Sequence, residues 1–338
     1  ITSIMTYWYP GTKEAVGAAR EVFPGSRIVV GGIYPSLCDE QARQQLRMAD
    51  LVVKHNEIET FYRFVDDALS TTLMFRPSIY ELDILPYPCY DLYDDIPFVP
   101  LLTSFGCIYR CTYCATPYMH PAIVRRSPFS VLEEIKHWHG YGVKRFVIYD
   151  DNFLHEKDRY AKPLLRGIAE LPFRIEIFNP NAVNAALIDE ELAELFCSSG
   201  FRELRIGLET TDPETQRSTG GKVNTRVFEK ALAILRNAGF DMETVSVYIL
   251  AGLPFQKWET VKEAIDFLFA LGVRPYMAEY TPIPHTEMFE KYCRFARYPI
   301  TQDALYQNNA LLSFAWEGFT EKDLRYLKQY VGEKRSPG

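Results

Sequence analysis

The sequence predicts an α/β protein: an incomplete six-unit (β/α) barrel preceded by part of a doubly wound, Rossmann-like parallel sheet. Two observations carry this prediction. Short apolar strands alternate with amphipathic helices along most of the 338 residues, and such alternation produces parallel sheets covered by helices. In addition, four of the later strands follow a glycine that precedes Phe or Val, as expected where each helix turns back to the sheet through a left-handed residue.

The composition is that of a folded globular chain. Hydrophobic residues make up 47% and charged residues 24%, which are ordinary values. The net charge of −7, without long basic runs, argues against binding to nucleic-acid backbones. The longest apolar stretch, 245–253, is too short to span a bilayer, and the first residues carry no export signal. We therefore expect a cytoplasmic protein with no nucleic-acid partner and no membrane span.

Residues 1–70 are interpreted as three strand–helix pairs of a partial Rossmann-like domain. The predicted strands are 1–5, 27–30 and 49–53, and the predicted helices are 12–23, 39–46 and 57–69. Three strands are few for a doubly wound sheet, which commonly has about five or six. We therefore expect the first half of this domain to be absent from the chain.

A proline-rich connector follows at 71–97, because each proline fixes its own backbone and disfavours helix at the preceding residue. The barrel domain is assigned to 98–285 and a helical extension to 286–338. The predicted barrel strands are 101–105, 143–149, 173–178, 203–208, 245–250 and 274–280, and the four strand-preceding glycines are Gly142, Gly200, Gly239 and Gly272. An open doubly wound sheet is the structural alternative.

Polar or glycine-bearing segments follow the predicted barrel strands. In either architecture, the chemistry of such a fold belongs at the carboxyl ends of the strands. These segments are 105–114, 150–152, 179–184, 209–211, 252–254 and 279–281.

The cysteines favour a metal or redox use over disulfides, because there are seven of them and no export signal. Cys107, Cys111 and Cys114 lie within eight residues of the loop after the first barrel strand. Three thiolates on one loop can each hold one iron of an iron–sulfur cube and leave the fourth iron open to a substrate. Two alternatives stay open: a structural zinc site completed by His120, and free cysteines packed in the core.

The motif Cys107-x-x-x-Cys111-x-Tyr113-Cys114, at the mouth of a six-unit barrel, resembles that of the radical S-adenosylmethionine enzymes over about residues 98–285. The resemblance implies that the three cysteines bind a four-iron, four-sulfur cluster whose free iron chelates S-adenosylmethionine. One electron then cleaves the sulfonium bond to give methionine and a 5′-deoxyadenosyl radical. It also implies a reductant such as flavodoxin or ferredoxin and a small-molecule substrate. No catalytic residue is assigned.

The resemblance also implies S-adenosylmethionine ligands at two strand ends. Asp150 and Asp151 stand where the family often has a Gly-Gly-Glu motif for the methionine amino group; the alternative is a solvated acidic turn. Glu209 matches the position that accepts the ribose hydroxyls. The alternative for Glu209 is a salt bridge to Arg205 or another nearby arginine.

Two further segments are matched to the adenine side of the same cofactor. The resemblance implies that Gly252 and Pro254, at the end of the fifth barrel strand, bring the backbone close to adenine, which glycine permits. Tyr113, just before the last cysteine, would stack on the same ring.

The amino-terminal segments 2–11, 29–35 and 49–53 resemble the second half of the cobalamin-binding domain that precedes many barrels of this family. Glycine lets a large flat ring lie against the backbone. The alternative is a Gly-Gly turn in a doubly wound domain that holds no ligand. The residues expected nearest the corrin are Ser3, Tyr7, Gly31, Gly32 and Tyr34.

The function implied by the resemblance is cobalamin-dependent methyl transfer to an unactivated carbon or phosphorus. Two rival functions are a radical rearrangement or cyclisation without methylation, and a metal- or cobalamin-binding module without turnover. Methylthiolation of transfer RNA is disfavoured because the acidic chain has no basic appended domain.

Overall fold

The computed structural model describes residues 1–335, and these residues divide into two compact units. Unit 1 comprises residues 1–81, 113–119 and 279–315, and unit 2 comprises the rest of the described chain. No helix among the described residues is long and apolar enough to cross a membrane.

Unit 1 is built on a small parallel sheet. The strands lie in the order β1 (Thr2–Ser3), β2 (Val29–Gly32) and β3 (Leu51–Val52). The helices are α1 (Tyr9–Val22), α2 (Ile33–Leu37), α3 (Asp39–Gln45), α4 (Ile58–Leu69), α5 (Thr116–Met119) and α12 (Glu287–Tyr292). The three predicted strand–helix pairs are confirmed. The short helix α2 was not predicted, because five residues that include a proline show no helical periodicity.

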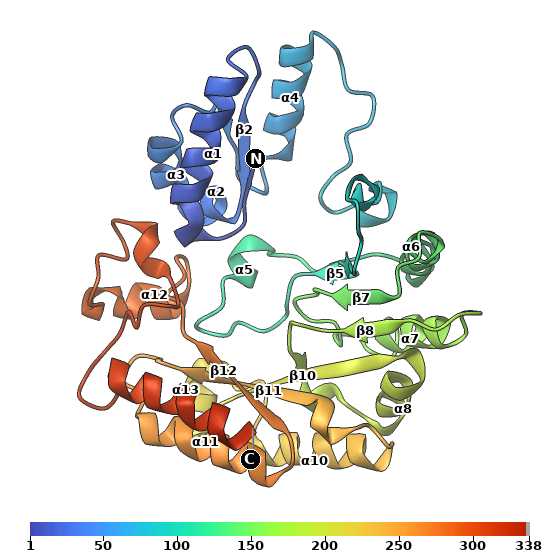
Figure 1. Ribbon diagram of the computed structural model, residues 1–338, viewed down its shortest axis with the longest axis vertical. Coiled ribbons are helices and arrows are strands. Elements are labelled where there is room, and N and C mark those ends of the chain that lie inside the picture. The colour runs from blue at the N-terminus through green and yellow to red at the C-terminus, as the bar shows by residue number, and fades with distance from the viewer. Residues whose placement is uncertain (336–338) are drawn as a thin grey trace. The chain divides into compact units, whose positions relative to one another are not determined.

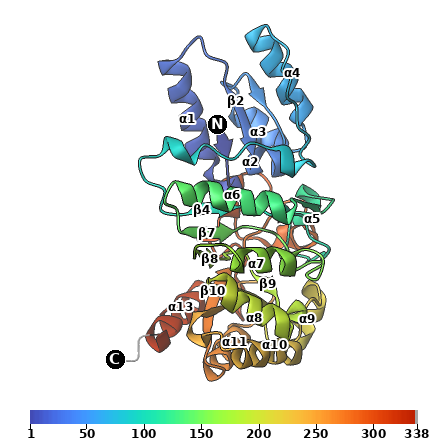
Figure 2. The ribbon, with the colours of Figure 1, turned by 90° about the vertical axis from the view of Figure 1, so that its right-hand side faces the viewer.

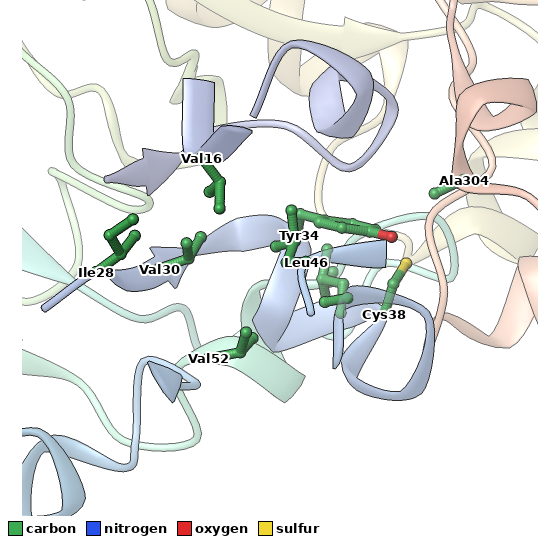
Figure 3. Close-up of a cluster of buried hydrophobic side chains, with 11 residues drawn as sticks. Val16, Ile28, Val30, Tyr34, Cys38, Leu46, Val52 and Ala304 are labelled. Carbon is green, nitrogen blue, oxygen red and sulfur yellow. The ribbon is translucent and has the colours of Figure 1, made fainter. Parts of the chain in front are cut away.

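The core of unit 1 joins segments that are far apart in the sequence (Figure 3). Val30 of β2 is fully buried, and Tyr34 of α2 is 0% exposed. The Tyr34 ring stacks on Tyr9 with the ring centroids 5.1 Å apart. Ala304, more than two hundred residues later, belongs to the same cluster. Because burial of each large apolar side chain contributes about 1.5–3 kcal/mol, these contacts stabilise unit 1 as one core.

Unit 2 is built on a parallel sheet that is open at both ends in the described residues. The path of the sheet is β12 (Arg274–Glu279), β11 (Val245–Ala251), β10 (Phe201–Glu209), β8 (Glu176–Phe178), β7 (Arg145–Ile148) and β4 (Val99–Leu101), and β9 (Val183–Asn184) pairs with β10. The registers of β4–β7, β7–β8, β8–β10 and β10–β11 are all parallel. This arrangement confirms the six-strand, incomplete-barrel prediction.

Helices follow the strands of unit 2 in sequence. They are α6 (Pro128–Gly140), α7 (Ala161–Ala169), α8 (Glu190–Ser199), α9 (Pro213–Thr219), α10 (Thr225–Asn237), α11 (Trp258–Ala270) and α13 (Glu321–Arg335). Figure 1 labels most of these elements, and Figure 2 shows α6, α7 and α8 next to one another beside the sheet. Ser127, Asp189 and Asn224 each cap a helix by accepting a backbone N–H, which satisfies one otherwise unpaired donor of the first turn.

The glycines predicted to end helices do so. Gly142, Gly200, Gly239 and Gly272 have φ values of +88°, +95°, +82° and +72°. At the first of them, the Val143 N–H reaches back to the Trp138 carbonyl at 3.2 Å, which satisfies a carbonyl that the end of α6 leaves free. The glycine pattern therefore reports the helix ends.

The first predicted barrel strand, 101–105, is divided into two elements. β4 ends at Leu101, and β5 (Ser104–Phe105) forms a separate antiparallel pair with β6 (Val124–Arg125). The division occurs where the Thr103 N–H donates to the Asp150 side chain at 2.8 Å. A side chain has replaced a neighbouring strand as the acceptor, so the chain leaves the sheet just before the cysteine loop.

Candidate functional site

A tight turn precedes the cysteine loop at Gly106. Its φ is +89°, and a Cβ placed there would lie 2.4 Å from the Ala122 carbonyl oxygen. Only glycine fits this approach without a shift of the backbone. The Gly106 N–H donates to Asp151 Oδ2 at 2.8 Å. The residue just before Cys107 is therefore fixed by both packing and a hydrogen bond.

Asp150, one of the predicted cofactor ligands, is buried beneath the start of the same loop. It accepts the Thr103 N–H at 2.8 Å, the Thr103 hydroxyl at 2.5 Å and the Ser104 hydroxyl at 2.6 Å. Burial raises the pKa of Asp150 to about 6, although the hydrogen bonds from Ser104 and Thr103 oppose this rise. The structure thus gives Asp150 buried protein partners, so the solvated-turn alternative is wrong for this residue, and its contact with the cofactor stays a prediction.

Asn152 was not singled out as a site residue from the sequence. Its side-chain Nδ2 donates to Cys107 Sγ at 3.6 Å, and Asn152 is 8% exposed. The signal in the sequence was its place directly after two aspartates at a strand end. That signal does not say which of the three side chains faces the cysteine.

The segment after α9 packs against Cys111. The Thr112 N–H donates to the Thr219 carbonyl at 3.2 Å. A Cβ on Gly220 would lie 3.0 Å from Cys111 Sγ and 3.2 Å from its Cα. Gly220 is therefore a close neighbour of the second cysteine, a contact that the sequence does not predict.

Tyr109, between the first two cysteines, is held by a side chain from β9. The Asn184 Nδ2 donates to the Tyr109 hydroxyl oxygen at 2.7 Å, while Asn184 Oδ1 accepts the Ala186 N–H at 2.9 Å. Asn184 is buried. The middle of the cysteine loop is thus anchored to the end of β9.

Cys114 and Tyr113 belong to unit 1. The Cys114 thiol donates to the Thr116 hydroxyl at 3.3 Å. The stacking of Tyr113 on adenine stays a prediction. Cys107, Cys111 and Cys114 are not in disulfides and are partly exposed, whereas Cys38 is buried.

Among the described residues, no group of three or more Cys, His, Asp or Glu side chains converges as the ligands of one metal ion would. The zinc alternative required this convergence, with His120 as the fourth ligand. The His120 ring instead packs against Phe105, with the centroids 4.5 Å apart. A four-iron cluster makes a different demand, because each cysteine binds a different iron.

Glu209 forms an ion pair with Lys222. Glu209 Oε1 lies 2.7 Å from Lys222 Nζ, and the two side chains are 13% and 22% exposed. The alternative prediction, a salt bridge from Glu209 to an arginine, is wrong because the partner is a lysine. Arg205 instead pairs with Glu203 at 2.9 Å and donates to the Tyr248 hydroxyl at 2.8 Å. Glu209 also has a left-handed backbone, with φ +69°.

Gly252 ends β11 in a turn with φ +86°. Its N–H donates to Gln256 Oε1 at 2.8 Å, and the Leu253 N–H donates to the same oxygen at 3.2 Å. Gln256 also donates to the Leu250 carbonyl at 2.9 Å. The side chain of Gln256 therefore fixes the turn that leads to Pro254, and the expected backbone approach to adenine stays a prediction.

Three of the residues predicted nearest the corrin have structural roles in unit 1. Ser3 is 1% exposed, and its hydroxyl accepts from Thr12 at 3.0 Å. A Cβ on Gly32 would lie 2.4 Å from the Ser3 carbonyl oxygen. The absence of a side chain at Gly32 thus makes room for strand β1, and Tyr34 lies in the core of unit 1 (Figure 3). The proximity of these three residues to a corrin stays a prediction.

Gly31 and Tyr7, the other two residues predicted nearest the corrin, are less tightly packed. A Cβ on Gly31 would meet Val53 at an ordinary 3.6 Å. Tyr7 is partly buried and packs edge-on against Trp8, with the ring centroids 6.1 Å apart. Their predicted proximity to a corrin is not tested.

Comparison with known proteins supports the interpretation of the cysteine loop. Residues 101–268 match the Radical SAM superfamily. An uncharacterised methyltransferase, PH0819 of Pyrococcus horikoshii, is 26% identical, with 99% of this chain and 74% of that protein covered. The bacteriochlorophyllide d C-12(1)-methyltransferase of Chlorobaculum tepidum is 25% identical, with 79% of this chain and 60% of that protein covered.

A solved structure shares the fold. The radical S-adenosylmethionine methyltransferase TsrM from Kitasatospora setae, with cobalamin and a [4Fe-4S] cluster bound, superposes with a TM-score of 0.70 at 18% identity. The match covers 88% of this chain and 65% of TsrM, so the chain spans about two thirds of that protein. On the family match, the cysteine motif and the parallel sheet, this chain is an enzyme of the radical S-adenosylmethionine superfamily, whose cofactors are a four-iron, four-sulfur cluster and S-adenosylmethionine.

Proposed function

We propose that Cys107, Cys111 and Cys114 hold a four-iron, four-sulfur cluster for the reductive cleavage of S-adenosylmethionine. The observation that carries the proposal is the cysteine loop: three cysteines within eight residues, none of them in a disulfide and all partly exposed. Cys38 provides the contrast, because burial raises the pKa of its thiol to about 11 and keeps it protonated. Thiolates are the usual ligands of iron–sulfur clusters, so the donor set fits.

When bound, the cluster and S-adenosylmethionine supply a 5′-deoxyadenosyl radical. The residues of the chain hold and orient these groups. The Gly106 turn fixes the entry to the loop, and Gly220 leaves space beside Cys111. The carboxylate of Glu209 is the proposed acceptor for the ribose hydroxyls, and Lys222 holds it in place at 2.7 Å.

We extend the proposal to cobalamin-dependent methyl transfer onto an unactivated carbon or phosphorus of a small molecule. The relatives in Pyrococcus and Chlorobaculum are named as methyltransferases, and TsrM was solved with cobalamin. Unit 1 supports the same proposal, since its three parallel strands match half of a Rossmann-like sheet. An external one-electron reductant, such as flavodoxin or ferredoxin, completes the requirements.

The test is anaerobic purification of the complete natural protein with iron and sulfide, followed by addition of hydroxocobalamin. We expect an iron–sulfur absorption spectrum, formation of 5′-deoxyadenosine with reductant, and a retained corrin spectrum after gel filtration. Stoichiometric zinc without iron would overturn the cluster. A protein that forms 5′-deoxyadenosine but retains no corrin would overturn methyl transfer in favour of radical chemistry without methylation.

A further inference from the structure

Three consecutive residues after β7 all bond to the cysteine loop or its entry. Asp150 accepts from Thr103 and Ser104, and Asp151 accepts the Gly106 N–H. Asn152 donates to Cys107 Sγ. The two aspartates accept hydrogen bonds from the chain before Cys107, whereas Asn152 donates one to the Cys107 sulfur.

The environment of Asn152 makes this donor significant. Asn152 is 8% exposed, so solvent replaces a lost hydrogen bond poorly. Its Nδ2 lies 3.6 Å from Cys107 Sγ, an ordinary donor distance for the large sulfur atom. An amide N–H stabilises a thiolate more as the negative charge on the sulfur grows.

We infer that Asn152 is a positioning residue that sets the reduction potential of the cluster through Cys107. This inference rests on the proposed function, because it requires a cluster on that sulfur. A reduced cluster carries one more negative charge than an oxidised one. Hydrogen bonds to cluster sulfurs therefore favour the reduced form and raise the potential.

The test compares Asn152→Leu and Asn152→Asp with the parent protein after anaerobic reconstitution. Leu removes the donor at similar volume, and Asp keeps the shape but replaces the donor with an acceptor. We expect the midpoint potential to fall in Asn152→Leu and to fall further in Asn152→Asp, with a changed EPR signal of the reduced cluster. If Asn152→Leu holds no iron, Asn152→Ala replaces it in the comparison.

The matched control is Asn179, a buried amide at the end of β8. Asn179 Nδ2 donates to the Asn181 and Arg205 carbonyls, each at 3.0 Å, and to no sulfur. Asn179→Ala is expected to lower the thermal stability while leaving the midpoint potential unchanged.

The outcomes separate this inference from the proposed function. A parent protein that forms no iron–sulfur cluster refutes the proposed function. A parent protein with a normal cluster, and Asn152 variants whose potential equals that of the parent, would overturn the role of Asn152 alone. A fall in potential equally large in Asn179→Ala would also overturn it, because the effect would then be a general loss of packing.

Discussion

Glu209 and Lys222 lie 2.7 Å apart at the carboxyl end of β10, thirteen residues from each other in the sequence. This pair provides the sharpest test of the S-adenosylmethionine pocket. Glu209→Ala is expected to keep the cluster but weaken S-adenosylmethionine binding, because loss of a carboxylate partner typically costs about 1.5–3 kcal/mol, or roughly ten- to hundred-fold in affinity. Anaerobic calorimetry measures the affinity.

The control for this prediction is Glu203, on the same strand. It pairs with Arg205 at 2.9 Å and precedes Glu209 by six residues, near the other end of β10. Glu203→Ala should bind S-adenosylmethionine as the parent does. If Glu203→Ala and Glu209→Ala bind S-adenosylmethionine with equal affinity, Glu209 does not bind the ribose.

Replacing any one of Cys107, Cys111 or Cys114 by Ala is expected to remove most of the iron and all cleavage of S-adenosylmethionine. An incomplete set of thiolates does not hold the cube. Iron analysis and 5′-deoxyadenosine formation are the two measurements. Cys197→Ala is the control, because Cys197 is exposed on α8. A full iron content in one of the three variants contradicts the assignment of that cysteine.

Gly106→Ala is expected to destabilise the protein and lower its iron content. An alanine at φ +89° costs about 1–2 kcal/mol for the backbone conformation alone, and its Cβ would also meet the Ala122 carbonyl at 2.4 Å. Gly142→Ala is the matched control, since φ is +88° and nothing lies within 4 Å of its Cβ. If both variants lose equal stability and keep their iron, the close approach at Gly106 does not shape the loop.

Asp150 predicts a pH dependence of stability. Its folded pKa of about 6 exceeds the usual value of about 3.9 in an unfolded chain. Its contribution to stability is therefore full below pH ~4 and is lost as the pH rises through about 6. The melting temperature of the parent, relative to that of Asp150→Asn, should fall between about pH 4.5 and 6.5.

Asp189 supplies the control for this pH dependence. Burial opposes the shift, but hydrogen bonds from Lys157 and Lys162 lower the pKa of Asp189 to about 2. Its titration lies below the tested range, so Asp189→Asn should lower the melting temperature by the same amount at each pH. A constant difference between the parent and Asp150→Asn would show that the buried carboxyl does not titrate there.

Gly32→Ala is expected to unfold unit 1 at a lower temperature, whereas Gly31→Ala should be tolerated. The first substitution places a Cβ 2.4 Å from the Ser3 carbonyl oxygen, and the second places one at 3.6 Å from Val53. Thermal unfolding followed by circular dichroism measures the difference. Corrin uptake by folded Gly31→Leu then reports whether this glycine faces the ring, and unchanged uptake contradicts that prediction.

Much of the fold could be predicted because its signals are local. Helix ends at Gly142 and Gly200 follow from the φ freedom of glycine, and strand ends follow from runs of apolar residues. The division of the first barrel strand could not be predicted, because Thr103 takes its acceptor from Asp150, forty-seven residues later. A hydrogen bond over that separation leaves no periodic pattern in the sequence.

The sequence by itself determined the residue types that carry the chemistry, namely three thiols at a fixed spacing and carboxylates at the ends of parallel strands. Only the tertiary structure decided the partners of those side chains. In the folded chain Asn152 donates to Cys107 and Lys222 pairs with Glu209. The Ser3 backbone occupies the space that a side chain at position 32 would need. The reason is physical: backbone conformation depends on neighbours along the chain, whereas hydrogen bonds and packing depend on distances that only the folded chain sets.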